Sequence, residues 1–206
     1  GRILEPSAGI GHFLGCMPAD VASRSRITAI EIEYEGTVTE INTDPITSCL
    51  LAHLLGTQMS TVNMVNAPQV AESKGIKIKQ SYNKTPGNWR SMINLIVTTT
   101  GRTRNVTGTL FTGREPRIVN IEGVPIEAAL SGDMLFIRND DRPGMIGALG
   151  GVLGEAGKNI ADFRLGRKDT KSGAICLVGL DAPINDDLFK KIEAIDSITS
   201  AKRLRF

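Results

Sequence analysis

The feature that most constrains the fold is the alternation of strand and helix patterns over residues 133–206. Two stretches with helical spacing of apolar residues lie between short segments rich in apolar and β-branched residues. In chain order the segments are MLFIRN, RPGMIGALGGVLGEAG, NIADFRLGR, GAICLVGLD, DDLFKKIEAI and ITSAKRLRF. Asn185 precedes the second helix and suits its N-cap. The predicted order is β-α-β-β-α-β, the split βαβ arrangement of a ferredoxin-like domain.

The first of these helices combines an apolar face with several glycines. Met145, Leu149 and Val152 share one face, with Ile146 and Leu153 beside them. The glycines are Gly147, Gly150 and Gly151. Because glycine lowers helix propensity, we expect close packing of this helix on the sheet to explain them.

Residues 27–130 predict a separate α+β domain. Apolar and polar residues alternate over 27–41, which indicates a strand, and Gly36 marks a bend or bulge in it. Asp44 suits the N-cap and Pro45 the first turn of a following helix.

Further along this domain, the sequence predicts a short strand at 62–66 and a second helix from Ala67 to about Gly75, with Asn66 as a candidate N-cap. Residues 81–91 have the composition of a loop, and short strands separated by glycine turns follow. The predicted fold class is therefore α+β, with two successive domains at 27–130 and 133–206.

Composition narrows the range of functions. The net charge of +2 and the 4% of aromatic residues argue against a nucleic-acid partner. The three cysteines are scattered, which fits a reducing compartment, and no metal-ligand spacing is present. No apolar run approaches the roughly 18 residues of a membrane helix. We expect a cytoplasmic protein that contacts neither membrane nor nucleic acid.

The sharpest candidate site is the junction between the first strand and first helix of the 133–206 segment. Backbone N–H groups at a helix start favour a carboxylate, and Asp141 could hold an ammonium group. Asn139, two residues earlier, and Asn159, just after the helix, could add hydrogen bonds. Together these groups suit a zwitterion such as an amino acid. The alternative is that Asp141 only caps the helix and Asn159 lies in a turn.

The same stretch, RNDDRPGMIGALGGVLGEAGKNIADFRLGR, resembles an ACT domain, a small-molecule regulatory module. Together with VNAP and GTLFTGREPRIV, it makes residues 27–206 similar to the C-terminal half of the D-3-phosphoglycerate dehydrogenase family. The resemblance implies an allosteric substrate-binding domain at 27–130 and an ACT domain at 133–206.

The resemblance also implies a ligand and a partner. In this family ACT domains pair side by side in a dimer, and L-serine, the end product of its pathway, binds at the seam in many members. The corresponding residues are Asn139 and Asp141, facing Asn159 of the partner subunit. The implied protein is an L-serine effector module of L-serine biosynthesis that acts as a homodimer or a higher oligomer.

A second candidate site follows from the middle domain, which binds an anion or the substrate in some family members. The basic candidates are Arg102, Arg104, Arg114 and Arg117. The alternative is a solvated basic edge. The segment GVPIEAAL lacks the extra basic residues of some anion-sensing members, so we expect no second effector site.

The family's enzymes oxidise 3-phosphoglycerate with NAD, and that chemistry has no counterpart in this sequence. It needs a dinucleotide fold with a glycine-rich loop and an Arg, a Glu and a general-base His. His12 lies in the N-terminal stretch, and His53 lies on a Leu-rich helix, where a packed or edge histidine is the ordinary interpretation. We therefore expect no cofactor in this chain, with NAD belonging to the parent family, and no dehydrogenase activity from the chain alone.

Residues 1–33 carry a different resemblance. RILEPSAGIGHFLG and the following strand resemble the first βαβ unit of class I adenine-type DNA methylases, which bind S-adenosylmethionine. The candidate loop residues are Glu5, Gly9 and Gly11, with Glu31 or Glu33 placed to hold ribose hydroxyls. The further strands and the Pro-rich catalytic motif of such enzymes are absent from the sequence. We therefore expect residues 1–26 to be a methylase-like stub. The alternatives are an S-adenosylmethionine-binding fragment and a folded fusion without a ligand.

Overall fold

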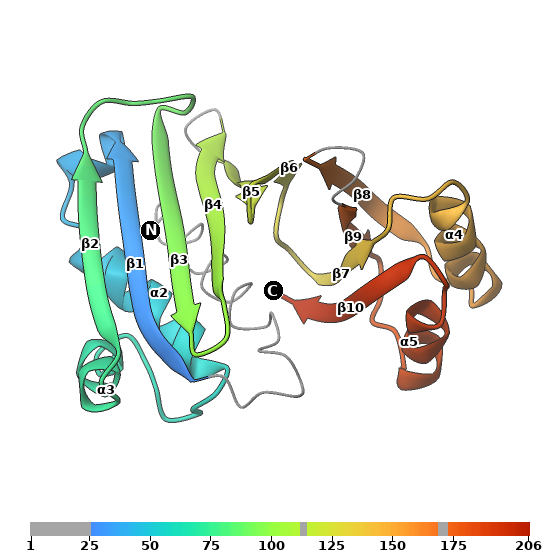
Figure 1. Ribbon diagram of the computed structural model, residues 1–206, viewed down its shortest axis with the longest axis horizontal. Coiled ribbons are helices and arrows are strands. Elements are labelled where there is room, and N and C mark those ends of the chain that lie inside the picture. The colour runs from blue at the N-terminus through green and yellow to red at the C-terminus, as the bar shows by residue number, and fades with distance from the viewer. Residues whose placement is uncertain (1–25, 112–114, 169–172) are drawn as a thin grey trace. The chain divides into compact units, whose positions relative to one another are not determined.

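The computed structural model describes residues 26–111, 115–168 and 173–206 (Figure 1). The chain divides into two compact units, Gly1–Glu122 and Gly123–Phe206. Each unit contains a β-sheet and α-helices, which confirms the predicted α+β class. The division places β6 (Val124–Ala128) in the second unit.

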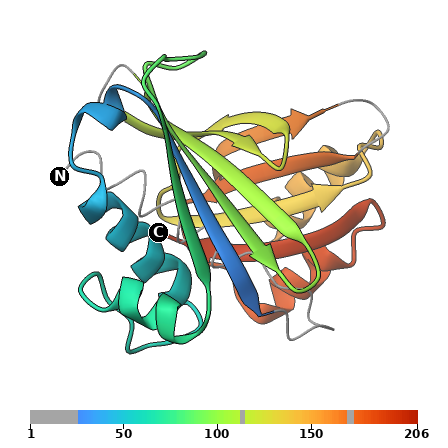
Figure 2. The ribbon, with the colours of Figure 1, turned by 60° about the vertical axis from the view of Figure 1, so that its left-hand side comes forward.

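The first unit is a β-sheet with helices packed on one face (Figures 1 and 2). Its elements are β1 (Ile27–Gly36), the 3-10 helix η1 (Thr37–Glu40), α2 (Asp44–Gly56), α3 (Ala67–Ser73), β2 (Lys77–Asn83), β3 (Ser91–Thr99), β4 (Thr103–Phe111) and β5 (Glu115–Ile121). The strands of this unit lie in the order β2-β1-β3-β4-β5. The β1–β2 pair is parallel, and the other pairs are antiparallel.

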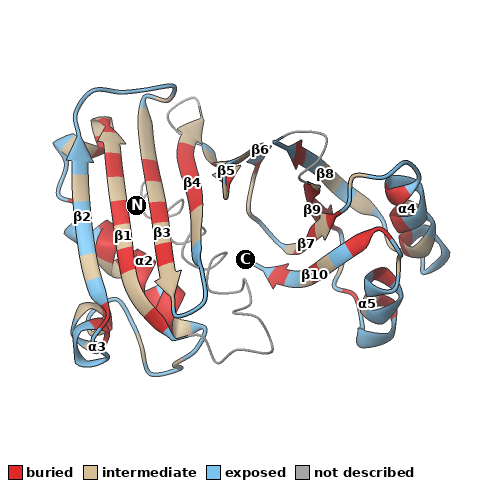
Figure 3. Cartoon of the chain, in the orientation of Figure 1, coloured by how far each residue is buried: buried red, intermediate tan, exposed pale blue. Residues whose placement is uncertain are grey.

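The alternation predicted for β1 decides which face of this sheet is buried. Ile30, Ile32 and Tyr34 are 0%, 0% and 1% exposed, whereas the glutamates between them are half-buried. Figure 3 shows the same alternation of buried residues along β1 and β3. The strand ends at Gly36, whose φ of 75° and close approach to the Arg90 carbonyl require a glycine. The predicted bend at Gly36 is confirmed.

A polar network joins the start of α2 to the sheet. The Tyr34 hydroxyl and Thr47 Oγ1 lie 2.8 Å apart, and Thr47 donates to Gln80 Oε1 at 2.9 Å. Tyr82 donates to the same Gln80 oxygen at 2.8 Å and lies 2.9 Å from Thr43 Oγ1. The Tyr34 and Tyr82 rings stack with centroids 5.4 Å apart. These bonds fix α2 against β1 and the edge strand β2.

Three expectations for the first unit were wrong. Asp44 is the first residue of α2 instead of its N-cap, and the N-cap position is held by Thr43 without a side-chain hydrogen bond. Residues 62–66 form turns instead of a strand, because Asn63 and Asn66 bind one another's backbone N–H groups at 2.8 and 3.2 Å. Strand β2 was not predicted, and its last residues fall in the expected loop. Its polar sequence has no apolar face, and parallel pairing with β1 holds it in place.

The second unit contains the predicted β-α-β-β-α-β order. Its further elements are β7 (Asp133–Asn139), α4 (Met145–Glu155), β8 (Ile160–Arg167), β9 (Ala174–Leu180), α5 (Asp186–Glu193) and β10 (Ile198–Arg205). The four strands lie in the order β10-β7-β9-β8, and every neighbouring pair is antiparallel. Asn185 caps α5 by accepting the Leu188 N–H at 2.9 Å, as predicted.

The two sides of α4 have opposite characters. Met145, Leu149 and Leu153 are buried in the core against Leu135 and Ile137 of β7. Ile146, expected beside this face, is 53% exposed.

The expectation that close packing on the sheet explains the α4 glycines was also wrong. A Cβ added to Gly147, Gly150 or Gly151, or to the further glycine Gly154, would meet no atom within 4 Å in the described part of the chain apart from its chain neighbours and the backbone of α4 itself. At 100° per residue these positions share the side of α4 that faces away from the core. That side is open to a partner.

Candidate functional site

The turn between β7 and α4 carries the main candidate residues on an unusual backbone. Asp141 has a φ of 53°, a left-handed value that is uncommon for residues other than glycine. Gly144, the N-cap of α4, has a φ of 92°. The Asp140 N–H donates to the Ser197 carbonyl at 2.9 Å, which ties the turn to the start of β10. The turn is therefore held in a defined and strained conformation.

The buried Asn139 holds this turn in place by a side-chain hydrogen bond. Its side chain is 3% exposed, and its Oδ1 accepts the Asp141 N–H at 2.9 Å. Its Nδ2 donates to Cys176 Sγ at 3.5 Å. Burial raises the pKa of the Cys176 thiol to about 11, and the Asn139 hydrogen bond lowers it by less. The Asn139 amide is thus engaged inside the unit, where it positions Asp141.

The Asp141 carboxylate already has a cationic neighbour. Arg167 Nη1, at the end of β8, lies 3.2 Å from Asp141 Oδ2. The Asp141 side chain is 18% exposed and that of Arg167 is 56% exposed. The pair therefore lies at the surface, where the aspartate is largely covered and the arginine can move.

A cavity of about 420 Å³ lies beside the same end of β7. Arg138, Asp140 and Arg142 line it together with Val124 and Thr199. Arg138 lies over the Phe136 ring, 5.2 Å from its centroid, and Arg142 pairs with Asp140 at 3.2 Å and with Asp196 at 3.5 Å. The charges around this cavity are largely balanced by their own neighbours.

Asn159 lies at the other end of the sheet. Asn139 pairs with Ala174 at the start of β9, whereas Ile160 pairs with Leu180 at its end. Asn159 is exposed, and its Nδ2 donates to Asp181 Oδ2 at 2.6 Å. Within one chain the structure brings Asn139 and Asp141 together and leaves Asn159 apart from them.

The arginines of the middle segment do not form one cluster in the described residues. Arg104 faces Val97 across the β3–β4 ladder and lies 3.7 Å from Glu122. Arg117 faces Thr109, near the other end of β4, and pairs with Glu115 at 3.0 Å. Arg102 lies in the exposed β3–β4 turn, and Arg114 is outside the described residues.

The methylase-like loop residues Glu5, Gly9 and Gly11 also lie outside the described residues. Glu31 and Glu33 are on β1, and each has a partner on a neighbouring strand. Glu31 accepts from Lys79 Nζ at 2.5 Å, and this bond raises the pKa of Lys79. Glu33 accepts from Asn94 Nδ2 at 2.6 Å.

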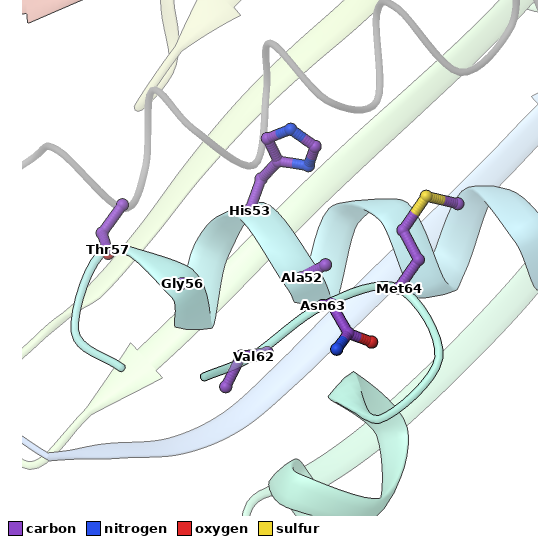
Figure 4. Close-up of a pocket in the computed structure, with 7 residues that line it drawn as sticks. All are labelled: Ala52, His53, Gly56, Thr57, Val62, Asn63 and Met64. Atoms are coloured by element: carbon purple, nitrogen blue, oxygen red, sulfur yellow. The ribbon is translucent and has the colours of Figure 1, made fainter. Parts of the chain in front are cut away.

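A pocket that the sequence did not indicate lies at the end of α2 (Figure 4). Its volume is about 440 Å³, and Ala52, Val62 and Met64 form much of its apolar wall. His53 Nδ1 lies 2.9 Å from the Cys49 carbonyl oxygen and donates a hydrogen bond to it, because a carbonyl oxygen can only accept. His53 is exposed, as the edge interpretation of the sequence expected.

The described residues show neither a cluster of metal ligands nor a helix that could cross a membrane. Among residues 26–111, 115–168 and 173–206, no group of three or more His, Cys, Asp or Glu side chains could hold a metal ion. In the same part of the chain, no helix has the length and apolar character needed to cross a bilayer.

Comparison with known proteins places nearly all of the sequence in one family. Residues 4–122 match the family model described as the D-3-phosphoglycerate dehydrogenase intervening domain. The D-3-phosphoglycerate dehydrogenase of Bacillus subtilis is 33% identical over 200 residues, which cover 97% of this chain and 38% of the relative. The enzyme of the same name from Synechocystis is 30% identical over 200 residues, covering 96% of this chain and 36% of the relative. The chain thus spans less than two fifths of the length of these relatives.

The family match also covers most of the stretch that resembles a methylase. It begins at residue 4 and so includes Glu5, Gly9, Gly11 and Glu31. The S-adenosylmethionine-binding alternative is therefore not favoured. The family model matches more than half of the chain, and the Bacillus subtilis relative is similar along nearly all of it. Both findings indicate the same family. The chain belongs to the D-3-phosphoglycerate dehydrogenase family and contains its intervening domain.

Proposed function

We propose that this chain is an effector-binding regulatory module of its family, with L-serine as the effector. The observation that carries the proposal is the Asp141 carboxylate, held in a left-handed turn at the start of α4. An ammonium group would bind this carboxylate, and the N–H groups of the first helical turn favour the effector's own carboxylate. In this proposal residues 27–130 are an allosteric substrate-binding domain and residues 133–206 are an ACT domain.

The site needs two copies of the chain. Asp141 precedes α4 and Asn159 follows it, and an 11-residue helix is about 16 Å long. A twofold axis that pairs α4 with the partner's α4 in antiparallel fashion would bring Asp141 next to the partner's Asn159. Because a twofold interface is the same patch on both copies, two equivalent sites would form.

The surface of the second unit supports this pairing. The open side of α4 carries only hydrogen atoms at its glycines, so a partner helix can approach the backbone closely. Ile146 and Leu165 add apolar exposure, at 53% and 38%. β8 is an edge strand, but β6 already lies against it near Gly166, where an added Cβ would clash with the Pro125 carbonyl oxygen. The pairing is therefore proposed through α4, with the free part of β8 beside it.

The role proposed for the residues of this chain is regulation. The relatives are named as dehydrogenases, and this chain spans less than two fifths of their length. We place the module in the cytoplasm, because its scattered cysteines fit a reducing compartment.

Calorimetric titration with L-serine tests the proposal, with S-adenosylmethionine as the second titrant. We expect heat with L-serine at about one ligand per chain, and sedimentation should show a concentration-dependent dimer. A chain that stays monomeric at high concentration with L-serine present, or that gives heat only with S-adenosylmethionine, would refute it.

A further inference from the structure

The Asp141–Arg167 ion pair places a full positive charge in the proposed site, which the candidate residues Asn139, Asp141 and Asn159 do not supply. Without Arg167, the site would present the Asp141 carboxylate and only the partial positive charge at the start of α4. With Arg167 Nη1 at 3.2 Å from Asp141 Oδ2, the site contains one negative and one positive charge. A ligand that separates Arg167 from Asp141 must carry a positive group for Asp141 and a negative group for Arg167. A ligand with only one of these charges would leave one of the two side chains without a partner.

We propose that Arg167 is the residue that makes this site selective for zwitterions, binding the carboxylate of an α-amino acid whose ammonium group binds Asp141. This inference rests on the proposed effector function and adds to the N–H groups of α4 a charged side chain that holds the ligand's carboxylate. It also names the ligand class: short α-amino acids are accepted, and amines or carboxylic acids that carry only one of the two charges are rejected.

The geometry of the pair allows this exchange. Asp141 is fixed, because its side chain is 18% exposed and its N–H is bound by Asn139. Arg167 is 56% exposed and ends the edge strand β8, so its long side chain can turn aside while its strand stays paired with β9. A guanidinium has five N–H donors in a planar fork that matches a carboxylate, so it can hold a ligand carboxylate beside Asp141.

Both flanking segments keep the pair in place. The Asp141 backbone is tied to Asn139, and Asn139 is approached closely by Gly173, at which a Cβ would lie 2.6 Å from the Asn139 carbonyl oxygen. Arg167 is opposite Ala174, the residue that also pairs with Asn139. The register therefore sets the two charged residues on the same end of the sheet, independently of their side-chain conformations.

The test compares two ligands in three variants. L-serine carries both charges, and ethanolamine is the same molecule without the carboxylate. Arg167→Gln removes the proposed carboxylate partner and leaves Asp141 without a neutralising charge. Arg164→Gln is the matched control, because Arg164 is on the same strand, is 50% exposed and pairs with Asp162 at 3.0 Å. Arg167→Lys keeps the charge without the fork.

Calorimetry on the full chain should show that the preference for L-serine over ethanolamine falls about tenfold or more in Arg167→Gln. The preference should be unchanged in Arg164→Gln and intermediate in Arg167→Lys, and all three variants should keep the wild-type thermal midpoint to within a few degrees. An unchanged preference in Arg167→Gln, with L-serine still bound, would overturn the role of Arg167 and leave the effector function standing. If the wild-type chain bound neither ligand, the effector function would fail and this inference with it. Should Arg167→Gln not fold, an Arg167→Lys variant with the wild-type preference would also overturn it.

Discussion

Asn139 Oδ1 accepts the backbone N–H of Asp141 at 2.9 Å, and this bond joins a fully buried amide to a residue with a left-handed backbone. The Nδ2 of the buried Asn139 donates to Cys176 Sγ. The partly buried member, Asp141, carries the carboxylate that we assign to the effector. The buried Asn139 thus sets the backbone conformation of Asp141 at the surface of the unit.

Replacing Asn139 by Ala should lower both stability and effector affinity. The substitution removes two buried hydrogen bonds and leaves the Asp141 N–H without its acceptor, which should cost about 1–3 kcal/mol of unfolding free energy. L-serine affinity should fall because Asp141 is no longer held in place. Urea denaturation and calorimetry measure the two effects.

The control for this experiment is Asn159→Ala. Asn159 is exposed, so its loss should change the unfolding free energy by less than about 0.5 kcal/mol while still weakening L-serine binding. Equal stability of the two variants would contradict the assigned roles of the buried and exposed asparagines.

Asp141→Asn should separate charge from conformation. Asparagine tolerates the left-handed region, so the turn should persist, and loss of a surface ion pair should cost less than about 1 kcal/mol. L-serine binding should nevertheless disappear, because no anion is left for the ammonium group. Asp162→Asn removes the equivalent ion pair with Arg164 and should leave binding intact. Wild-type affinity in Asp141→Asn would refute the site.

The glycines of α4 should be needed for pairing and not for folding. Gly147→Leu and Gly151→Leu place side chains in open space, and each should raise helix stability by roughly 0.5–1 kcal/mol. The same side chains should separate the two helices and weaken the dimer. Sedimentation equilibrium and denaturation of the dilute chain distinguish the two effects.

Lys190→Leu on the exposed side of α5 provides the comparison for the glycine variants, and it should leave the dimer intact. If the variant that combines Gly147→Leu and Gly151→Leu formed a dimer as strong as the wild type, the open side of α4 would be excluded as the interface.

Tyr34 should make stability depend on pH at the alkaline end. Burial raises the pKa of Tyr34 to about 12 from its ordinary value of 10.0. The folded state therefore binds this proton more tightly than the unfolded state does. Its contribution is fully present below pH 10 and is lost as the pH rises towards 12. One such group changes the unfolding free energy by at most about 1.4 kcal/mol per pH unit in this window.

Denaturation of Tyr34→Phe between pH 9 and pH 12 checks this prediction. The variant should lose part of the alkaline slope at a cost of about 1 kcal/mol at neutral pH, from the lost contact with Thr47. Tyr82→Phe leaves the buried Tyr34 hydroxyl in place and should keep most of the slope, because burial is the largest cause of the raised pKa of Tyr34. An identical slope in wild type and Tyr34→Phe would contradict the assignment.

Local patterns in the sequence were sufficient to predict most helices and strands of the second unit. The alternation of strands with helices predicted its order of elements, and Asn185 was predicted as a cap that the structure shows. These features depend on residues a few positions apart, whose hydrogen bonds and side-chain periodicity act within one element. The contact between Asn139 and Asp141 was expected for the same reason, because two residues in one turn must be neighbours.

Other features depended on contacts distant in sequence. Strand β2 is polar on both faces, and it is a strand because parallel pairing with β1 satisfies its backbone. Arg167 was not singled out, because nothing near it in the sequence indicates Asp141, 26 residues away. The open side of α4 was misjudged, because a helical glycine that packs on the sheet and one that faces away from it look the same in the sequence.

The sequence by itself therefore determined the α+β class, the order of the C-terminal elements, the family and the two residues of the β7–α4 turn. The tertiary structure decided that Asn139 is buried and supports Asp141, that Arg167 neutralises Asp141, and that Asn159 lies at the opposite end of the sheet. The physical reason is the range of the interactions. Helix caps, alternation and turns act over a few residues, whereas burial and ion pairing across strands depend on the register that the whole sheet adopts.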